Sequence, residues 1–286
     1  MVVILLVILF MWWGNDTEPV VIENQAVTPV VTATSSSQNK AETVLGTSVQ
    51  GRPIMAYHFG TGPEEVLLVG GIHGGYEWNT ALLAYDVIDY LKANPSSIPA
   101  KLTVTVVPVL NPDGLALTVG TSSRFALSAV PATEAATIPG RFNANNVDLN
   151  RNFACEWSKT GKWQSRTVSG GTSAFSEPES LAVKNYVEKQ NLEAVIVWYS
   201  AAGGVYASAC GETVSADTME LTNIYAKASG YPAYDEFDAY TTSGDMVNWL
   251  ASKNIPAISV LLTNHTSTEW SKNWAGLQAV FKQLAN

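Results

Sequence analysis

Residues 140–153 read Gly140-Arg141-Phe142-Asn143-Ala144-Asn145-Asn146-Val147-Asp148-Leu149-Asn150-Arg151-Asn152-Phe153, and this stretch says most about the fold and the function. It places two arginines and an amide close together in the chain. A guanidinium is always charged, and its planar fork of N–H donors fits a carboxylate. We therefore predict that Arg141, Asn150 and Arg151 line a pocket that grips a terminal carboxylate and steadies an oxyanion.

A second polar segment lies upstream and reads Gly71-Ile72-His73-Gly74-Gly75-Tyr76-Glu77-Trp78. Its His73 and Glu77 are four positions apart and share a face if the segment is helical. Imidazole and carboxylate groups are common zinc ligands. Two alternatives remain: Glu77 only stabilises a helix N-terminus against the dipole, or each segment is a solvated turn.

Continuous apolar runs alternate with amphipathic segments along the rest of the chain. Such runs are typical of strands buried on both faces, and their alternation with helices predicts an α/β sheet covered on both sides. We expect strands at 66–70, 102–110, 194–199 and 256–261, and helices at 79–92, 176–189, 215–229, 244–253 and 268–284.

Together and in this order, the two polar segments resemble the zinc carboxypeptidase family (the funnelin-type metallopeptidases). The resemblance covers residues 43–286 and implies one domain with a mixed, mostly parallel twisted sheet and helices on both faces. Further matching motifs lie at 46–54, 111–114, 170–179, 240–245 and 255–262.

The resemblance implies a zinc ion held by His73, Glu77 and a later histidine, with a glutamate as general base. In our alignment the later histidine falls at Ser200 and the glutamate at Leu261. Serine is a poor zinc ligand, and leucine cannot carry a proton. We therefore expect weak zinc occupancy and impaired peptidase chemistry, as in a pseudoenzyme, because general-base catalysis alone contributes about 10²–10⁴-fold.

The substrate half of the site matches the family better. The resemblance assigns the oxyanion to Arg141 and the terminal carboxylate of a peptide to Asn150 and Arg151. It makes Tyr240 the side chain that closes over the substrate, and it places Val247 against the terminal side chain. An apolar Val247 favours apolar or aromatic C-terminal residues; the alternative is that Val247 is an ordinary residue of a helix core.

Three functions remain open at this point. The first is a carboxypeptidase with an atypical site, in which His265, Asp245, Glu269 or Glu212 replaces a missing group. The second is a non-catalytic protein that binds the C-termini of peptides or cell-wall peptides. The third is an ester or amide hydrolase that uses Ser200 with His265, although no Gly-x-Ser-x-Gly motif surrounds that serine.

Composition narrows the class of protein and its partners. Hydrophobic residues make up 47% of the 286 residues and charged residues 14%, so the chain can bury a large core. The net charge of −9 and the lack of a basic run argue against a nucleic-acid partner. The oligomeric state is not indicated.

The N-terminal residues indicate export. Residues 2–13 are almost all apolar, which is too short for a membrane span of about 20 residues but fits the core of a signal peptide. The first basic residue is Lys40, so an uncleaved anchor is the alternative. Residues 14–42 resemble a flexible polar tether that leads to the 43–286 domain, and we expect a protein that is secreted or held outside the cytoplasm at the membrane.

The chain has two cysteines, Cys155 and Cys210. An even number of cysteines in an exported protein favours one disulfide. The alternative is a pair of buried free thiols.

Overall fold

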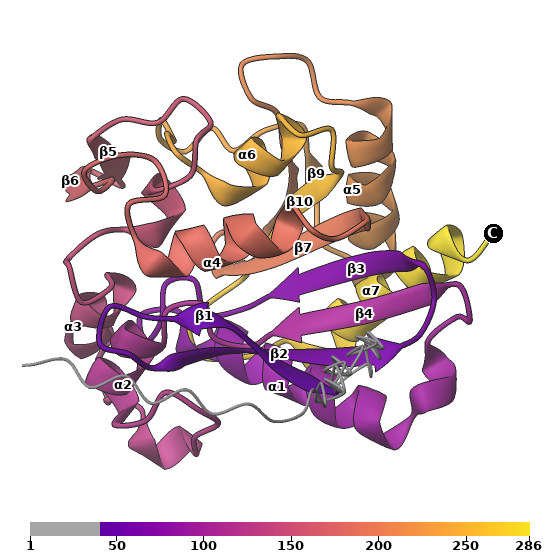
Figure 1. Cartoon of the computed structure of the whole chain (residues 1–286), viewed down its shortest axis with the longest axis horizontal. Helices are drawn as coiled ribbons and strands as arrows, with labels where there is room; N and C mark the ends of the chain where they lie inside the picture. Colours follow the sequence, from indigo (N-terminus) through magenta and orange to yellow (C-terminus); the bar gives the residue numbers. More distant parts are fainter. Residues whose placement is uncertain (1–40) are drawn as a thin grey trace, which may run out of the picture. The chain divides into compact units, whose positions relative to one another are not determined.

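Within residues 41–286, which are the part of the chain that the computed structural model describes, eight strands form one mixed sheet. A separate hairpin of two strands stands beside it (Figure 1). The predicted apolar segment 2–13 and nearly all of the predicted tether lie outside the described residues. The strands are β1 (Glu42–Thr47), β2 (Pro53–Gly60), β3 (Glu64–Val69), β4 (Leu102–Val107), β5 (Thr160–Trp163), β6 (Arg166–Ser169), β7 (Leu192–Ser200), β8 (Gly204–Ala207), β9 (Ala233–Tyr234) and β10 (Ala257–Leu262).

The order of the strands in the sheet is β1-β2-β4-β3-β7-β10-β8-β9. The four central strands β4, β3, β7 and β10 are parallel to one another, whereas β1, β2 and β8 join by antiparallel pairing. The central strands are also the most apolar, because they are covered on both faces. The predicted mixed, mostly parallel sheet is therefore confirmed.

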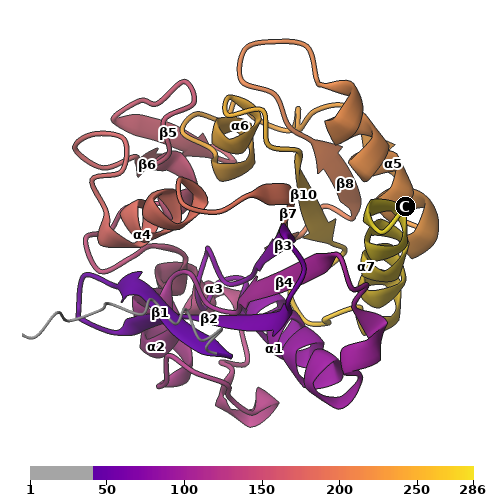
Figure 2. The same ribbon diagram turned by 45° about the vertical axis from the view of Figure 1, so that its right-hand side comes forward.

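Helices connect the strands and cover both faces of the sheet, as expected. On one face lie α1, α5 and α7, and on the other lie α4 and α6 (Figure 2). The expected helices begin and end within a few residues of the observed ones. The helices are α1 (Trp78–Ala93), α2 (Pro112–Val119), α3 (Glu134–Thr137), α4 (Pro178–Val187), α5 (Ala216–Ser229), α6 (Met246–Ala251) and α7 (Trp270–Leu284).

Side chains of each central strand alternate between two cores, because successive residues of a strand point to opposite faces. In β7, Ala194, Ile196 and Trp198 pack in the core with α1, α5 and α7. The intervening Val195, Val197 and Tyr199 pack in the core with α4 and α6. This alternation decides which residue at the end of β7 can reach the site described below.

The carboxyl ends of β3, β7 and β10 meet at one edge of the sheet, because the three strands are adjacent and parallel. This edge is where open α/β sheets place their ligands. None of the helices within residues 41–286 is both long enough and apolar enough to cross a bilayer.

Candidate active site

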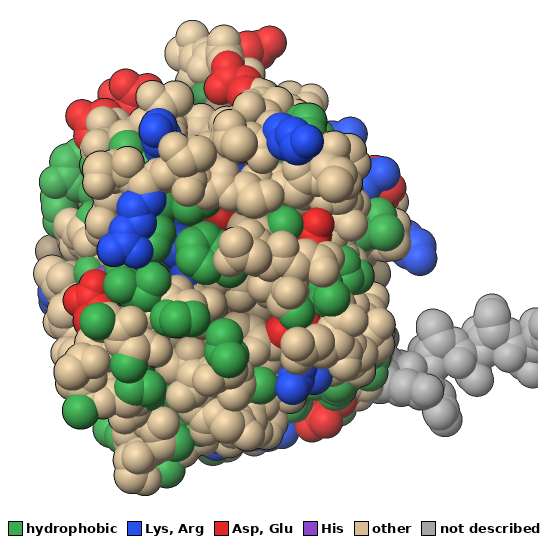
Figure 3. All heavy atoms as spheres, turned by 90° about the vertical axis from the view of Figure 1, so that its left-hand side faces the viewer, with side chains coloured by type: hydrophobic (Ala, Val, Ile, Leu, Met, Phe, Trp, Pro, Cys, Tyr) green, Lys and Arg blue, Asp and Glu red, His purple; other side chains and the backbone are tan. Residues whose placement is uncertain are grey.

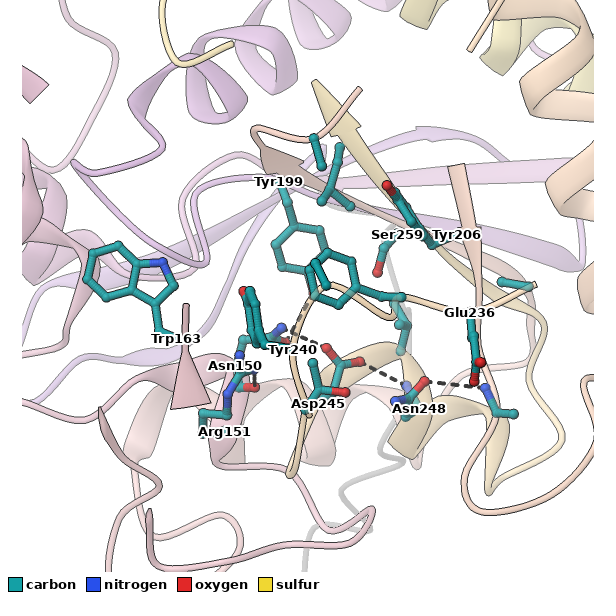
Figure 4. A pocket seen from close by; sticks show the side chains of 18 of the residues that line it. Asn150, Arg151, Trp163, Tyr199, Tyr206, Glu236, Tyr240, Asp245, Asn248 and Ser259 are labelled. Carbon is teal, nitrogen blue, oxygen red and sulfur yellow. Dashed lines mark hydrogen bonds between the residues drawn. The ribbon is translucent and has the colours of Figure 1, made fainter. Parts of the chain in front are cut away.

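A cavity of about 930 Å³ opens at this edge of the sheet and gathers most of the predicted site residues. In Figure 4, Tyr199, Tyr206 and Ser259 lie toward the strands, and Asn150, Asp245 and Asn248 lie opposite them. The predicted residues that line the cavity are His73, Glu77, Arg141, Asn150, Arg151, Ser200, Tyr240, Val247 and Leu261.

His73 and Glu77 sit in the turn between β3 and α1, and both are buried. His73 Nδ1 and Glu77 Oε1 are 2.9 Å apart, but their geometry is not that of a hydrogen bond, and Nδ1 and Glu77 Oε2 have no partner in the described structure. Two buried polar atoms that converge without bonding each other are what two ligands of one cation would show. His73 and Glu77 thus lie side by side, and their role as metal ligands stays a prediction.

Asp148 forms a hydrogen bond with His73, the first residue of this pair. Its Oδ1 accepts from His73 Nε2 at 3.2 Å, which leaves His73 Nδ1 on the side of Glu77. Its Oδ2 accepts from Nε and Nη2 of Arg141 at 3.1 and 2.9 Å. Burial alone would raise the pKa of Asp148, but the charges of Arg141, His73 and Arg151 outweigh it and hold that pKa well below its usual range.

Arg141 is almost fully buried and joins the carboxylates to an aromatic wall. Its Nη1 lies 3.7 Å from Glu77 Oε1, and its guanidinium carbon lies 4.5 Å from the centre of the Trp163 ring. Trp163 ends β5, so the separate hairpin supplies this wall. The pair Arg141–Asp148 explains how such a charge can be buried, since each group neutralises the other.

Asn150 and Arg151 follow Asp148 in a short 3₁₀ turn that the Asp148 side chain caps. Asn150 Nδ2 donates to Asp245 Oδ2 at 2.7 Å, and Asn150 Oδ1 accepts from the Tyr199 hydroxyl at 3.1 Å. Arg151 donates from Nε and Nη2 to the Lys162 carbonyl, at 3.0 and 2.9 Å. Both side chains are therefore fixed before a ligand arrives, with N–H groups to spare.

Two glycines let the chain approach this turn closely. A side chain at Gly161 would meet Arg151 Cδ at 2.8 Å, and one at Gly244 would meet the Arg151 carbonyl oxygen at 2.3 Å. Gly244 also has a φ of +62°, a conformation that glycine adopts without strain. As a result α6, which Asp245 caps by accepting from Asn248 N, begins directly beside Asn150.

The end of β7 differs from our expectation. Ser200 donates its hydroxyl to Asn79 Oδ1 of α1 at 2.9 Å, and the aromatic ring of Tyr199 lies 5.7 Å from the His73 ring. The residue that faces His73 is thus Tyr199, and Ser200 turns toward the other face of the sheet. Burial, followed by the charges of Asp245 and Glu77, raises the pKa of Tyr199 well above its usual value, so its phenol is a hydrogen-bond donor.

Leu261 lies directly opposite Tyr199 in the parallel pair of β10 and β7. Its side chain is 8% exposed and lines the cavity. An apolar side chain therefore stands where the alignment predicts a general base. That Leu261 replaces the general base stays a prediction of the alignment.

The proposed replacement groups do not complete a metal site. His265 lines the cavity, but its ring packs on Tyr76 at 4.6 Å. Glu269 is used elsewhere, by Thr263 and Tyr231, and Asp245 is occupied as described above. Among residues 41–286, no three His, Cys, Asp or Glu side chains are grouped so that they could hold a metal ion. Two ligands fit a zinc ion and the third is missing, so this site does not match the family's three-ligand set.

Tyr240 and Val247 complete the wall near Asn150. The ring centre of Tyr240 lies 5.8 Å from the guanidinium carbon of Arg151, and burial raises the pKa of its phenol. Val247 is buried in α6 and lines the cavity. Val247 also belongs to the core beneath α6, so both of its predicted roles are compatible with its position.

Cys155 and Cys210 form a disulfide with a Cα–Cα distance of 5.8 Å, which confirms the prediction of one bridge. Their neighbours Glu156, Gly211 and Glu212 line the mouth of the cavity. The bridge joins the segment after Phe153 to the loop between β8 and α5, at the top of Figure 1.

On the face that carries the hairpin, Lys and Arg side chains are interspersed with Asp and Glu, and acidic side chains stand at its upper edge (Figure 3).

Sequence reasoning missed Asp148 and Tyr199. Asp148 stands inside the quoted motif, two positions before Asn150, and a carboxylate between two arginines was a sufficient signal. Tyr199 could have been identified from the alternation of β7, because an odd-numbered residue shares the face of Val195 and Val197.

Comparisons of the sequence with known proteins match carboxypeptidases. Residues 31–282 match the family model described as zinc carboxypeptidase. Carboxypeptidase E of Caenorhabditis elegans is 34% identical over 122 residues, which cover 38% of this chain and 24% of that protein. Human carboxypeptidase Z is 34% identical over 123 residues, or 38% of this chain and 17% of that protein. The matched part thus spans about a quarter of these relatives or less.

Solved structures share the fold at lower identity. Bovine thrombin-activatable fibrinolysis inhibitor, in complex with tick carboxypeptidase inhibitor, gives a TM-score of 0.66 at 17% identity and covers 85% of this chain and 88% of that one. The murein-tripeptide amidase of Escherichia coli O157 gives 0.58 at 20% identity, covering 86% and 92%.

Proposed function

The chain belongs to the zinc carboxypeptidase family, and from that premise we propose that it binds the C-terminal residue of peptides or proteins while hydrolysing them slowly or not at all. The observation that carries the proposal is the contrast within one cavity. Arg141, Asn150 and Arg151 line the cavity, whereas Tyr199 lies beside His73 and Leu261 lies opposite Tyr199.

Recognition of a carboxylate is supported by the hydrogen-bond donors that remain. Asn150 Nδ2 carries two hydrogens, of which one is directed at Asp245, and the guanidinium of Arg151 is held in place by backbone carbonyls with N–H groups left over. Charge-assisted bonds from a preorganised guanidinium are stronger than neutral ones. Tyr240 stands next to Arg151 and would cover a bound terminal residue.

Hydrolysis in this family requires an activated water and a group that accepts its proton. A catalytic zinc is usually held by three protein ligands. His73, Glu77 and His265 each have a buried unpartnered atom, but no three His, Cys, Asp or Glu side chains of residues 41–286 are grouped so that they could hold a metal ion. Zinc, where bound, would supply a polarised water. Leu261 offers no acceptor for the proton of such a water, and the residues therefore favour binding over turnover.

A slow peptidase is the second candidate, because His73 and Glu77 lie side by side and His73 Nδ1 and Glu77 Oε2 have no hydrogen-bond partner. An ester or amide hydrolase that uses Ser200 is disfavoured, since the Ser200 hydroxyl donates to Asn79. We also propose export, on the basis of the apolar residues 2–13.

The test compares two ligands that differ at one end. Isothermal titration of the full-length chain with a peptide and with the same peptide amidated at its C-terminus should show about 10–100-fold weaker binding of the amide, since a hydrogen bond to a charged group is worth about 1.5–3 kcal/mol. Equal affinities would overturn the proposal. Release of the terminal residue at about 1 s⁻¹ or faster would show instead that the protein is a working peptidase.

A further inference from the structure

The carboxamide of Asn150 is held by three residues from two segments of the chain. Its Oδ1 accepts from the Tyr199 hydroxyl and from the backbone N–H of Met246, each at 3.1 Å. Its Nδ2 donates to Asp245 at 2.7 Å. The group that faces the ligand is therefore fixed by the end of β7 and by the start of α6 together.

Tyr199, near the end of β7, donates its hydroxyl to Asn150 from the side of the cavity that carries His73. It lies on the face of β7 that carries the His73 ring, where the family would have a side chain directed at a metal ion. A phenol hydroxyl extends farther from the backbone than an imidazole nitrogen does, and this hydroxyl reaches Asn150. Figure 4 shows the ring of Tyr199 above Asn150 and Tyr240.

We infer that Tyr199 is a positioning residue for the carboxylate-binding site, and that it has converted the third metal-ligand position into a support for Asn150, so that peptide binding does not depend on zinc. The inference rests on the proposed function. It departs from the three-ligand zinc site of the family at one named residue.

The inference follows from what Asn150 must do. A free amide can present either its oxygen or its nitrogen, and only the nitrogen attracts a carboxylate. Each donor that binds Oδ1 opposes a flip of the amide. Because Tyr199 is 5% exposed, water does not readily replace its hydroxyl when that hydroxyl is removed.

The test uses three full-length variants and two measurements. Tyr199→Phe removes the hydroxyl only, Tyr199→His restores an imidazole, and Tyr234→Phe makes the same chemical change at an exposed tyrosine outside the cavity. The first measurement is the Kd of a peptide with a free C-terminus, with and without a chelator. The second is zinc retained per chain after dialysis against trace zinc.

We expect the Kd of the wild-type protein to be unchanged by the chelator. Tyr199→Phe should bind about fivefold more weakly, as for one lost hydrogen bond, and should retain no more zinc than the wild type. Tyr199→His should retain about one zinc per chain, since three ligands make the usual set. Tyr234→Phe should match the wild type in both measurements.

Three results would overturn the inference: one zinc per wild-type chain, loss of wild-type binding on chelation, or an unchanged Kd in Tyr199→Phe. If the wild type binds neither the peptide nor its amide, the proposed function fails. Zinc retention by Tyr199→His alone would then still establish that Tyr199 has displaced the metal.

Discussion

The loop that carries Arg141, Asn150 and Arg151 and the strand ends that carry Tyr199 and Leu261 form two walls of one cavity, and they are built differently. In the loop wall each polar side chain is hydrogen-bonded to another part of the chain: Arg141 to Asp148, Asn150 to Asp245, and Arg151 to the Lys162 carbonyl. In the strand wall the side chains are set by the pleat of β7 and β10, and either an apolar or a polar residue fits the register. Substitution in the loop wall therefore endangers the fold, whereas substitution in the strand wall changes the chemistry first.

The largest effect should come from breaking the loop wall at Arg141. In Arg141→Leu the carboxylates of Asp148 and Glu77 lose their cation while buried, and we expect a loss of about 3–5 kcal/mol in the free energy of unfolding. The measurement is denaturant unfolding followed by tryptophan fluorescence.

The matched control for this change is Arg166→Leu. Arg166 also packs on the Trp163 ring, at 5.1 Å, but it is exposed, so its loss should alter stability by about 0.5 kcal/mol or less. Equal losses in the two variants would show that the aromatic contact, and not the buried charge pair, stabilises this wall.

A smaller effect should follow from removing the disulfide, which ties the segment after the loop wall to the loop between β8 and α5. The disulfide closes a loop of sequence separation 55, and replacing both Cys155 and Cys210 by serine should cost about 2–4 kcal/mol of stability. Thermal unfolding of the double variant and of the reduced wild type would measure it. A melting temperature that stays the same in both cases would contradict the expectation.

The smallest effect concerns the apolar side of the cavity. Val247→Ala removes about two methylene equivalents of contact and should weaken binding of a peptide that ends in leucine by about 1.5 kcal/mol. Binding of a peptide that ends in alanine should change much less, and comparing the two Kd values isolates the side-chain contact. If both peptides lose affinity equally, Val247 acts only through the packing of α6.

Much of the fold could be predicted from the sequence, because its central strands are continuous apolar runs and its helices are amphipathic. The polar motif at 140–153 predicted the loop wall because it places two arginines and an amide close together. Asp148 neutralises the buried Arg141, whereas Arg151 donates its hydrogen bonds to backbone carbonyls.

The strand wall was harder to predict, because successive residues of a strand point to opposite faces of the sheet, and the face must be known for each residue. A shift of one residue moves an assignment to the opposite face of the sheet, and this shift separates Ser200, which meets Asn79 of α1, from Tyr199, which meets His73. No local motif marks the register at the end of β7. Only the alternation of buried residues along β7, or the structure itself, shows that Tyr199 and not Ser200 faces His73.

The disulfide has a consequence for the kinetics of recognition. It cross-links two loops at the mouth of the cavity before any ligand arrives, so those loops lose little conformational entropy when a peptide enters. Because the two loops are already cross-linked, they do not have to become ordered each time a peptide C-terminus binds. Encounters should therefore be productive at rates set by diffusion and orientation, and the lifetime of the complex should be set by the contacts at Asn150 and Arg151.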